Sequence, residues 1–311
     1  MSDVKCFTVE SEQDGQTLLA LLRTEYPGLS WNACRKFLTG RRVAVNRVVC
    51  VHEARRMHPG DEVRVEANEI RPSSTAGPLL FHYVDEHLVV VDKPAGIVCT
   101  RRPEELHWPD QKKRLAPTLD ELVVDRLHPA SSKKRTVRPR ATELQRVQRL
   151  DRETSGVMVF ARTVAAASGL IEQFSEHRAE RLYHALVHGR LIAGTIRSHL
   201  VRDRGDGRRG SSPDGRHGVP AVTHVRPLEE RAGVSRVECR LETGRTHQIR
   251  THLSEQGNAV CGDRQYGVDD DAPRMALHAI FLAFVHPVTQ QRMEFTSPWP
   301  KDLATWWNSL G

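Results

Sequence analysis

The most informative stretch of the chain is residues 147–161, which read VQRLDRETSGVMVFA. Its apolar second half, rich in β-branched residues, predicts a strand over residues 155–162. Asp151 comes just before this strand, between Arg149 and Arg152. On an open surface these side chains would form only a solvated ion pair. In a cleft, the cations would keep the carboxylate ionised while it is partly desolvated, the state that a nucleophile needs.

Three further blocks accompany this stretch and decide between the two interpretations. They are residues 88–98 (LVVVDKPAGIV), 181–189 (RLYHALVHG) and 241–253 (LETGRTHQIRTHL). In this order, and together with Arg149-Leu150-Asp151, they resemble the signature of the RluA-type pseudouridine synthases. The resemblance covers roughly residues 79–300. It implies a pseudouridine synthase fold, with a mixed sheet and a central catalytic cleft across it.

The pattern along the chain predicts an α+β fold with a largely antiparallel sheet, because strands dominate and helices interrupt them. The expected strands cover residues 81–91, 155–162, 181–188, 234–242 and a hairpin of 277–285 with 292–295. The expected helices cover residues 164–176, 246–256 and 299–310. Two basic or glycine-rich segments, residues 101–146 and 202–218, are expected to be surface insertions.

The N-terminal part predicts a separate small α/β module. Leucines at positions 18, 19, 21 and 22 give one face of a first helix, and Ser30 caps a second helix that stops at Gly40. Short valine-rich strands follow around residues 43–49 and 63–65. The order resembles the RNA-binding domain of a small-subunit ribosomal protein, the S-four domain. We therefore expect an S-four-like domain at residues 1–66, a linker at 67–78 and a catalytic domain at 79–311.

The distribution of charge favours a polyanionic partner. The net charge is +7, with an isoelectric point near 9.3. Residues 26–52 contain no acid, and residues 133–152 contain eight Lys or Arg against two acids. By resemblance to the S-four domain, the cations that face RNA in the N-terminal module are Arg35, Lys36, Arg41 and Arg42. If either basic cluster occurred alone, a solvated basic surface with no RNA partner would be the alternative interpretation.

Several classes of protein are disfavoured by what the sequence lacks. The six cysteines are scattered and form no C-x-x-C pair, so we expect no structural zinc site, no disulfide framework and no other metal. No nucleotide-binding loop appears, and an isomerisation of uridine needs no cofactor. The first residues have no apolar signal core, and no stretch reaches transmembrane length. We expect a cytoplasmic protein without a membrane partner, and a monomer.

The resemblance also implies roles for single residues. Asp151 is the expected catalytic carboxylate, and Arg250 is its expected partner beside the buried stripe of a helix. Tyr183 would stack on the flipped base and take part in proton transfer at carbon 5. Arg149 would assist base extrusion. Arg245 and His247 would lie with Thr246 at a helix N-terminus, where a phosphate binds readily.

The chain departs from the family pattern at two positions, and the function keeps alternatives. Gln148 stands where a histidine is usual, and Arg181 stands where a lysine is usual. We expect a pseudouridine synthase that acts on structured RNA, with large-subunit ribosomal RNA ahead of tRNA. A non-catalytic RNA-binding or ribosome-assembly protein on the same scaffold is the alternative that Gln148 motivates. A glycosidase is disfavoured because no second carboxylate occupies a matching motif.

Overall fold

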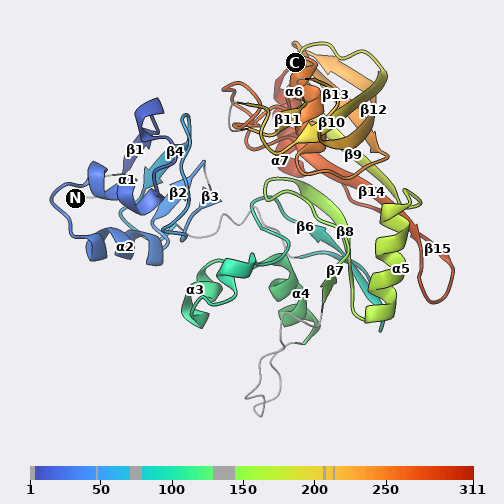
Figure 1. Ribbon diagram of the computed structural model, residues 1–311, viewed down its shortest axis with the longest axis horizontal. Coiled ribbons are helices and arrows are strands. Elements are labelled where there is room, and N and C mark those ends of the chain that lie inside the picture. The colour runs from blue at the N-terminus through green and yellow to red at the C-terminus, as the bar shows by residue number, and fades with distance from the viewer. Residues whose placement is uncertain (1–3, 47, 71–78, 129–143, 206–207, 213) are drawn as a thin grey trace. The chain divides into compact units, whose positions relative to one another are not determined.

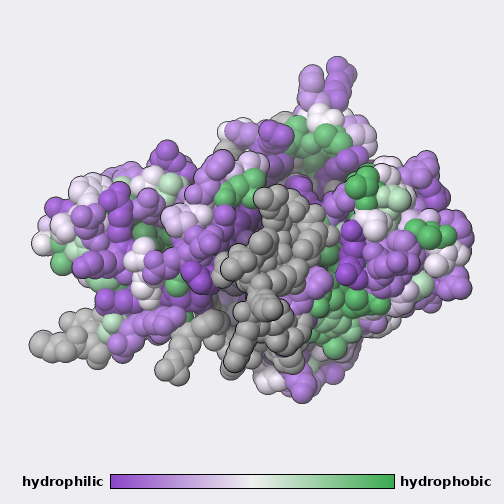
Figure 2. Space-filling model, turned by 90° about the horizontal axis from the view of Figure 1, so that it is seen from below, coloured by the Kyte–Doolittle hydropathy of each residue, from purple (hydrophilic) through white to green (hydrophobic). Residues whose placement is uncertain are grey.

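The computed structural model describes the chain except for residues 1–3, 47, 71–78, 129–143, 206–207 and 213. The chain forms two compact units. The first contains residues 1–77 and 101–118, and the second contains residues 78–100 and 119–311. Within the described part of the chain, no helix is both long enough and apolar enough to cross a membrane. On the face shown in Figure 2, hydrophilic residues predominate and hydrophobic ones gather in small patches.

The first unit contains a four-stranded antiparallel sheet with strand order β1-β4-β2-β3. Its strands and helices are β1 (Lys5–Thr8), α1 (Leu18–Glu25), α2 (Trp31–Thr39), β2 (Val43–Val45), β3 (Val48–Val49) and β4 (Glu62–Val65). Leucines of both helices and valines of β2 and β4 share one apolar core. The predicted helices and the strands β2, β3 and β4 are confirmed, and β1 was missed.

The helices of this unit begin where the sequence provides capping side chains. The Thr17 hydroxyl accepts a hydrogen bond from the Ala20 amide at 3.2 Å. Ser30 does the same for the Ala33 amide, also at 3.2 Å, as predicted. Each hydroxyl satisfies one of the amides that have no partner inside the helix. Helix α2 ends at Gly40, which confirms the expected stop.

Residues 101–118 fold with the first unit, although they follow part of the second unit in sequence. They contain η2 (Pro103–Glu105) and α3 (Asp110–Leu115). The Arg41 guanidinium donates a hydrogen bond to the Leu115 carbonyl at 2.6 Å. The rings of His52 and Trp108 meet edge to face with centroids 5.4 Å apart. The compact units therefore interleave along the chain, whereas the sequence predicted contiguous domains.

The second unit is built on an 11-stranded sheet whose main path runs β11-β10-β12-β13-β9-β14-β8-β6-β5, with β15 beside β14 and β7 beside β8. Its strands are β5 (Phe81–Val84), β6 (Leu88–Lys93), β7 (Gln145–Arg146), β8 (Ser155–Ala161), β9 (Glu180–His188), β10 (Gly194–Val201), β11 (Gly210–Ser211), β12 (Val219–Arg231), β13 (Val234–Leu241), β14 (Leu277–Val285) and β15 (Arg292–Thr296). Its helices are α4 (Leu119–Leu127), α5 (Val164–Ser175), α6 (Gln248–Glu255) and α7 (Lys301–Ser309). Among the described pairs only β14 with β8 is parallel, which confirms a mixed, largely antiparallel sheet.

Strand β8 is buried on both faces, which explains its continuous apolar sequence. Met158 and Phe160 face the larger core, which also receives side chains from α4, α6 and α7. Val157 and Val159 face a second core, together with side chains of α5. Figure 1 shows α5 beside β8 and β14. The strand that follows the Asp151 loop is thus held from both sides.

Three further details of the sequence prediction were wrong. A single strand over residues 81–91 is two strands, because the Asp85 carboxylate accepts hydrogen bonds from the amides of His87 and Leu88, both at 2.7 Å, and so makes a turn. Residues 101–146 are not only a surface insertion, since Leu119 and Val123 of α4 are fully buried. Helix α6 starts at Gln248 because His247 adopts a left-handed backbone with φ of 60°.

Gly156 generates a prediction about stability. Its φ is 118°, and a Cβ atom there would lie 2.2 Å from the Ala279 carbonyl oxygen on the parallel neighbour β14. We expect Gly156→Ala to destabilise the protein by more than about 2 kcal/mol, through backbone strain and the lost pairing. Urea denaturation measures this. Gly194→Ala, where nothing lies within 4 Å of the added atom, should stay within about 0.5 kcal/mol of the wild type. Equal stabilities of the two variants would contradict this account.

Candidate active site

The loop between β7 and β8 carries Asp151. The Leu150 side chain is buried in the larger core. The Leu150 backbone exchanges hydrogen bonds with the Cys99 thiol, with separations of 3.3 and 3.4 Å. The next side chain, that of Asp151, is 19% exposed. The anchored residue before it thus fixes the carboxylate at the protein surface, where a substrate can reach it.

A buried lysine fixes the other side of the loop. Lys93 at the end of β6 is 1% exposed. Its ammonium group donates hydrogen bonds to the carbonyls of Pro94, Arg152 and Thr154 at 3.0, 2.9 and 2.6 Å. Burial lowers the pKa of Lys93 to about 8, although the nearby Cys99 and Asp151 oppose the shift. No role for Lys93 was predicted from the sequence, and in the structure its ammonium group braces the loop that carries Asp151.

Arg250 of α6 joins Asp151 to a second carboxylate. The Arg250 side chain is 6% exposed, and its Nη1 donates to Asp151 Oδ2 at 3.3 Å. Its Nε and Nη2 donate to the two oxygens of Asp263 at 2.6 and 2.9 Å. This bidentate pair fixes the plane of the guanidinium. One edge of the arginine is therefore occupied by Asp263, and Nη1 is left to orient Asp151.

Burial and charge act in opposite directions on Arg250. Burial alone lowers its pKa, but the hydrogen bonds and charge of Asp263, helped by Asp151, outweigh burial and raise the pKa above its ordinary value. The guanidinium is consequently charged at every relevant pH. Asp263 is itself buried and accepts hydrogen bonds from the amides of Gln265 and Tyr266 at 3.0 and 3.2 Å.

The segment after α6 also supports His247. The Tyr266 ring lies under the Arg250 guanidinium, 4.9 Å from it. The Tyr266 hydroxyl is hydrogen-bonded to His247 Nδ1 at 2.8 Å, and His247 Nε2 lies 4.0 Å from Asp151 Oδ1. Burial lowers the pKa of His247, against the opposing charge of Asp151. The sequence prediction did not include three residues of this segment, Asp263, Gln265 and Tyr266. The pattern that could have indicated them is the glycine-flanked polar run at residues 262–267 (GDRQYG).

Tyr183 of β9 is buried in the larger core. Burial raises the pKa of its phenol to about 12, with Arg181 lowering it and Asp151 raising it further. The phenol is therefore protonated at neutral pH and is a hydrogen-bond donor. The role of Tyr183 beside Asp151 and Arg250 remains a prediction.

The predicted RNA-binding residues of the second unit divide into two groups. Arg149 is exposed and hydrogen-bonded to the Thr246 hydroxyl, and His247 lies near Asp151. Arg245 instead donates to the Pro220 carbonyl at 3.1 Å. Arg149 and His247 are thus gathered around Asp151, and Arg245 is engaged beside β12.

In the first unit, the predicted RNA-binding arginines make contacts within the protein. Arg35 pairs with Glu53 at 2.8 Å. Arg42 donates to the Glu66 carbonyl at 2.7 Å and lies over the Phe37 ring. Arg41 donates to Leu115, as described above. Lys36 is exposed on α2. RNA binding by these four residues remains a prediction.

Comparison with known proteins shows which family the chain belongs to. The family model described as RNA pseudouridylate synthase matches residues 87–255. A Synechocystis protein named as an uncharacterized RNA pseudouridine synthase is 34% identical, over 90% of this chain and 84% of that protein. This chain belongs to the RNA pseudouridine synthase family. It is accordingly an isomerase.

Other members of the RNA pseudouridine synthase family resemble the chain over a similar extent. The ribosomal large subunit pseudouridine synthase D of Xylella fastidiosa is 34% identical, over 96% of this chain and 89% of that protein. The Zymomonas mobilis protein of the same name is 34% identical, over 73% and 71%. The structure of human RNA pseudouridylate synthase domain containing 1 is 27% identical, with a TM-score of 0.53 over 74% of this chain and 86% of that chain.

The two departures from the family pattern have different surroundings in this pseudouridine synthase. Arg181 is buried and donates to the Glu242 carbonyl at 3.0 Å. Gly244 leaves room for it, since a Cβ atom there would lie 2.6 Å from Arg181 Nη1. The Gln148 side-chain amide nitrogen is buried and has no hydrogen-bond partner among the described residues. Arg181 therefore has a carbonyl partner, whereas the Gln148 amide nitrogen has none among the described residues.

The buried lysine generates a prediction. Lys93→Met keeps an apolar stem and removes the ammonium group, so buried carbonyls lose their donor and stability falls by about 1–3 kcal/mol. Folding lowers the pKa of Lys93 from 10.5 to about 8. The unfolded chain therefore binds more protons in this window, and wild-type stability relative to the variant should rise as pH rises through it.

Urea denaturation of both proteins at several pH values measures these two effects. Lys301→Met, at an exposed position, is the control and should stay within about 0.5 kcal/mol of the wild type. A variant as stable as this control, with no dependence on pH, would show that the lysine does not brace the loop.

The Asp263–Arg250 pair generates a second prediction for this site. Asp263→Asn should lower kcat by about 10- to 100-fold with a smaller change in KM, because Arg250 loses the partner that fixes its plane. Asp302→Asn breaks a comparable pair, Arg274 with Asp302 at 2.7 and 3.3 Å. Tritium release from RNA labelled at carbon 5 of uridine measures turnover, and circular dichroism checks folding. Equal kcat values for the two folded variants would rule out a positioning role.

Proposed function

We propose that this enzyme converts uridine to pseudouridine in large-subunit ribosomal RNA, with Asp151 as the catalytic carboxylate. The RNA class is supported by relatives of 34% identity whose names assign them to the large ribosomal subunit. The assignment of Asp151 is supported by its position: the carboxylate is half-buried and lies 3.3 Å from Arg250 Nη1. A carboxylate that is both accessible and oriented suits attack on, or proton abstraction from, a ribose.

The reaction places clear demands on this site. The bond from ribose carbon 1′ to uracil N1 breaks, the base rotates, and carbon 5 bonds to carbon 1′. Carbon 5 then loses its proton, and N1 takes up a proton. Asp151 acts at the sugar, either by forming a covalent adduct or by removing a ribose proton before a glycal intermediate. Both routes need the carboxylate next to the ribose and oriented by Arg250. No electrons are gained or lost overall.

The remaining roles follow from the positions of Tyr183 and Arg149. A target base inside folded RNA must leave its stack to reach a carboxylate in the protein. The exposed Arg149 guanidinium beside the Asp151 loop suits the space that the base leaves. The ring of Tyr183 offers an aromatic face on which the flipped base can stack. Its protonated hydroxyl can take part in proton transfer at carbon 5 of the base.

The first unit is proposed as an S-four-like RNA-binding module. Its two capped helices and short strands follow the order that the resemblance implies. Lys36 on α2 contributes an exposed cation, and Arg35, Arg41 and Arg42 flank it with cations that exchange their present partners for phosphate. The cysteines in the described residues are all free. Free thiols suit the reducing cytoplasm, where we place the enzyme, acting as a monomer without a membrane partner.

The experiment that tests this proposal is tritium release from RNA labelled at carbon 5 of uridine. Unmodified large-subunit ribosomal RNA and unmodified tRNA are supplied in parallel to the full-length protein. We expect release from the ribosomal RNA. Asp151→Asn should lower turnover by at least about 10³-fold, because a catalytic group is lost, while RNA affinity stays nearly unchanged.

Glu153→Gln is the matched control, since it neutralises an acid of the same loop. It should keep most of the activity if Asp151 is the specific carboxylate. Release from tRNA alone would overturn the proposed RNA class. Turnover of Asp151→Asn close to that of the control would overturn the catalytic assignment.

A further inference from the structure

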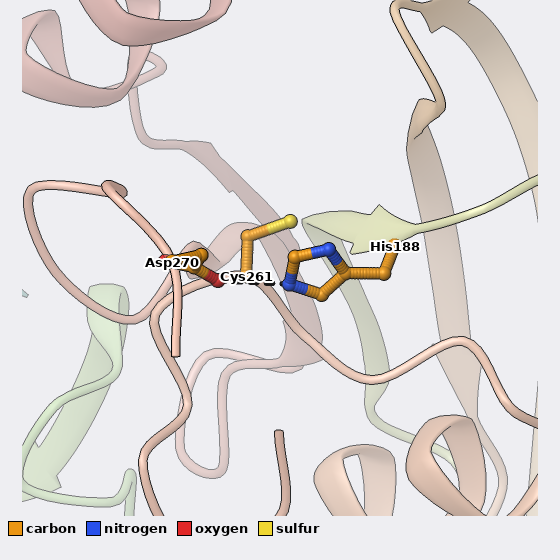
Figure 3. Close-up of side chains that lie close together, drawn as sticks. All are labelled: His188, Cys261 and Asp270. Carbon is orange, nitrogen blue, oxygen red and sulfur yellow. Dashed lines mark hydrogen bonds and ion pairs between the residues drawn. The ribbon is translucent and has the colours of Figure 1, made fainter. Parts of the chain in front are cut away.

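A second cluster of titratable side chains lies apart from Asp151. His188 at the end of β9, Cys261 after α6 and Asp270 in the following loop bring an imidazole nitrogen, a sulfur and a carboxylate oxygen within 4.8 Å of one another. Figure 3 shows the three side chains converging, with His188 hydrogen-bonded to Asp270. The mechanism proposed above uses none of the three.

The backbone holds these residues in fixed positions. The Cys261 amide donates to the Leu186 carbonyl of β9 at 2.9 Å, and the Cys261 carbonyl accepts from Ala276 at 2.8 Å. The His188 amide donates to the Ala259 carbonyl at 3.0 Å. The Asp270 carboxylate accepts from the amides of Gly262 and Ala272 at 2.8 and 3.0 Å. Held in this way, the three side chains are preorganised with respect to one another.

Charge at the cluster favours a cation. The Cys261 thiol is fully buried, and the side chain of Asp270 beside it is only 10% exposed. A divalent cation bound here would neutralise the buried carboxylate and would be held by the thiolate form of the cysteine, which is the form that binds metal.

We propose that His188, Cys261 and Asp270 form a zinc-binding site. Thiolate, imidazole and carboxylate are the ligands that zinc accepts, whereas magnesium and calcium prefer oxygen alone. Zinc–ligand bonds of about 2.0–2.3 Å require ligand separations of about 3.2–3.7 Å in a tetrahedron. The 2.8 Å His188–Asp270 contact is shorter than this range and would lengthen on binding, and all three ligand atoms already lie within 4.8 Å of one another.

The site leaves an open coordination position. The His188 side chain is 29% exposed, so the ion has a path from solvent and a place for a water ligand. No metal was expected from the sequence, because zinc motifs are recognised by short spacings between their ligands. Here the ligands lie at positions 188, 261 and 270, and only the pairing of β9 with the segment after α6 brings them together.

The position of the site gives the metal a structural role. Cys261 and Asp270 bracket the segment that contains Asp263 and Tyr266, which hold Arg250 and His247. An ion bound to both ends of this segment ties it to β9. Zinc should therefore raise the thermal stability of the protein without taking part in the isomerisation.

Calorimetric titration of the metal-stripped full-length protein tests the proposal, with magnesium as the comparison ion. We expect one zinc per chain, a rise in Tm on adding zinc, and no binding of magnesium. Cobalt should give the charge-transfer absorption that only a thiolate ligand produces. His188→Gln, Asp270→Asn and Cys261→Ser should each weaken zinc binding by more than about 100-fold, the upper end of the effect of losing a supporting residue.

Cys239→Ser is the matched control, because Cys239 is also a fully buried free thiol with a pKa raised by burial to about 12. It should bind zinc like the wild type. Absence of zinc binding by the wild type, cobalt binding without the thiolate band, or equal loss in the control would overturn the proposal. His188→Gln changes a partly exposed residue and stays informative if Cys261→Ser does not fold. All these readouts are made without RNA and are independent of the substrate.

Discussion

The buried charge of Arg250 is the constraint on which the candidate site depends. A guanidinium removed from water is strongly unfavourable unless carboxylates and hydrogen bonds replace the lost solvent. Asp263 supplies two of these bonds and Asp151 supplies a third. Asp263 is held in turn by two backbone amides. The orientation of the Asp151 carboxylate therefore depends on a short segment that follows α6.

The same site depends on burial of the loop that carries Asp151. Leu150 inserts into the larger core, and β8 is packed on both faces directly after the loop. Lys93 fills the space behind the loop and satisfies its carbonyls. The acid is thus set between an apolar anchor and a buried ammonium. A surface loop of the same sequence without these two supports would let Asp151 move away from Arg250.

The sequence predicted the parts of this site that are local. The apolar run after Asp151 gives a strand, and the spacing of Ile249 and Leu253 gives a helix whose buried stripe carries Arg250 to the edge of the core. Asp263 and Lys93 could not be predicted as partners, because their contacts join residues far apart along the chain. The folding of residues 101–118 with the first unit could not be predicted either, because it also depends on contacts between distant parts of the chain. In addition, the charge-rich composition of this segment resembles that of a surface insertion.

The charges around Asp151 balance one another inside the protein. The carboxylates of Asp151 and Asp263 share the guanidinium of Arg250, and the buried Lys93 ammonium lies behind the Asp151 loop. Burial lowers the pKa of His247 and raises the pKa of Tyr183 to about 12, so neither side chain adds charge near neutral pH. This group therefore has no excess positive charge that would attract phosphate. Attraction of RNA has to come from cations outside the group, such as the exposed Arg149 of the same loop.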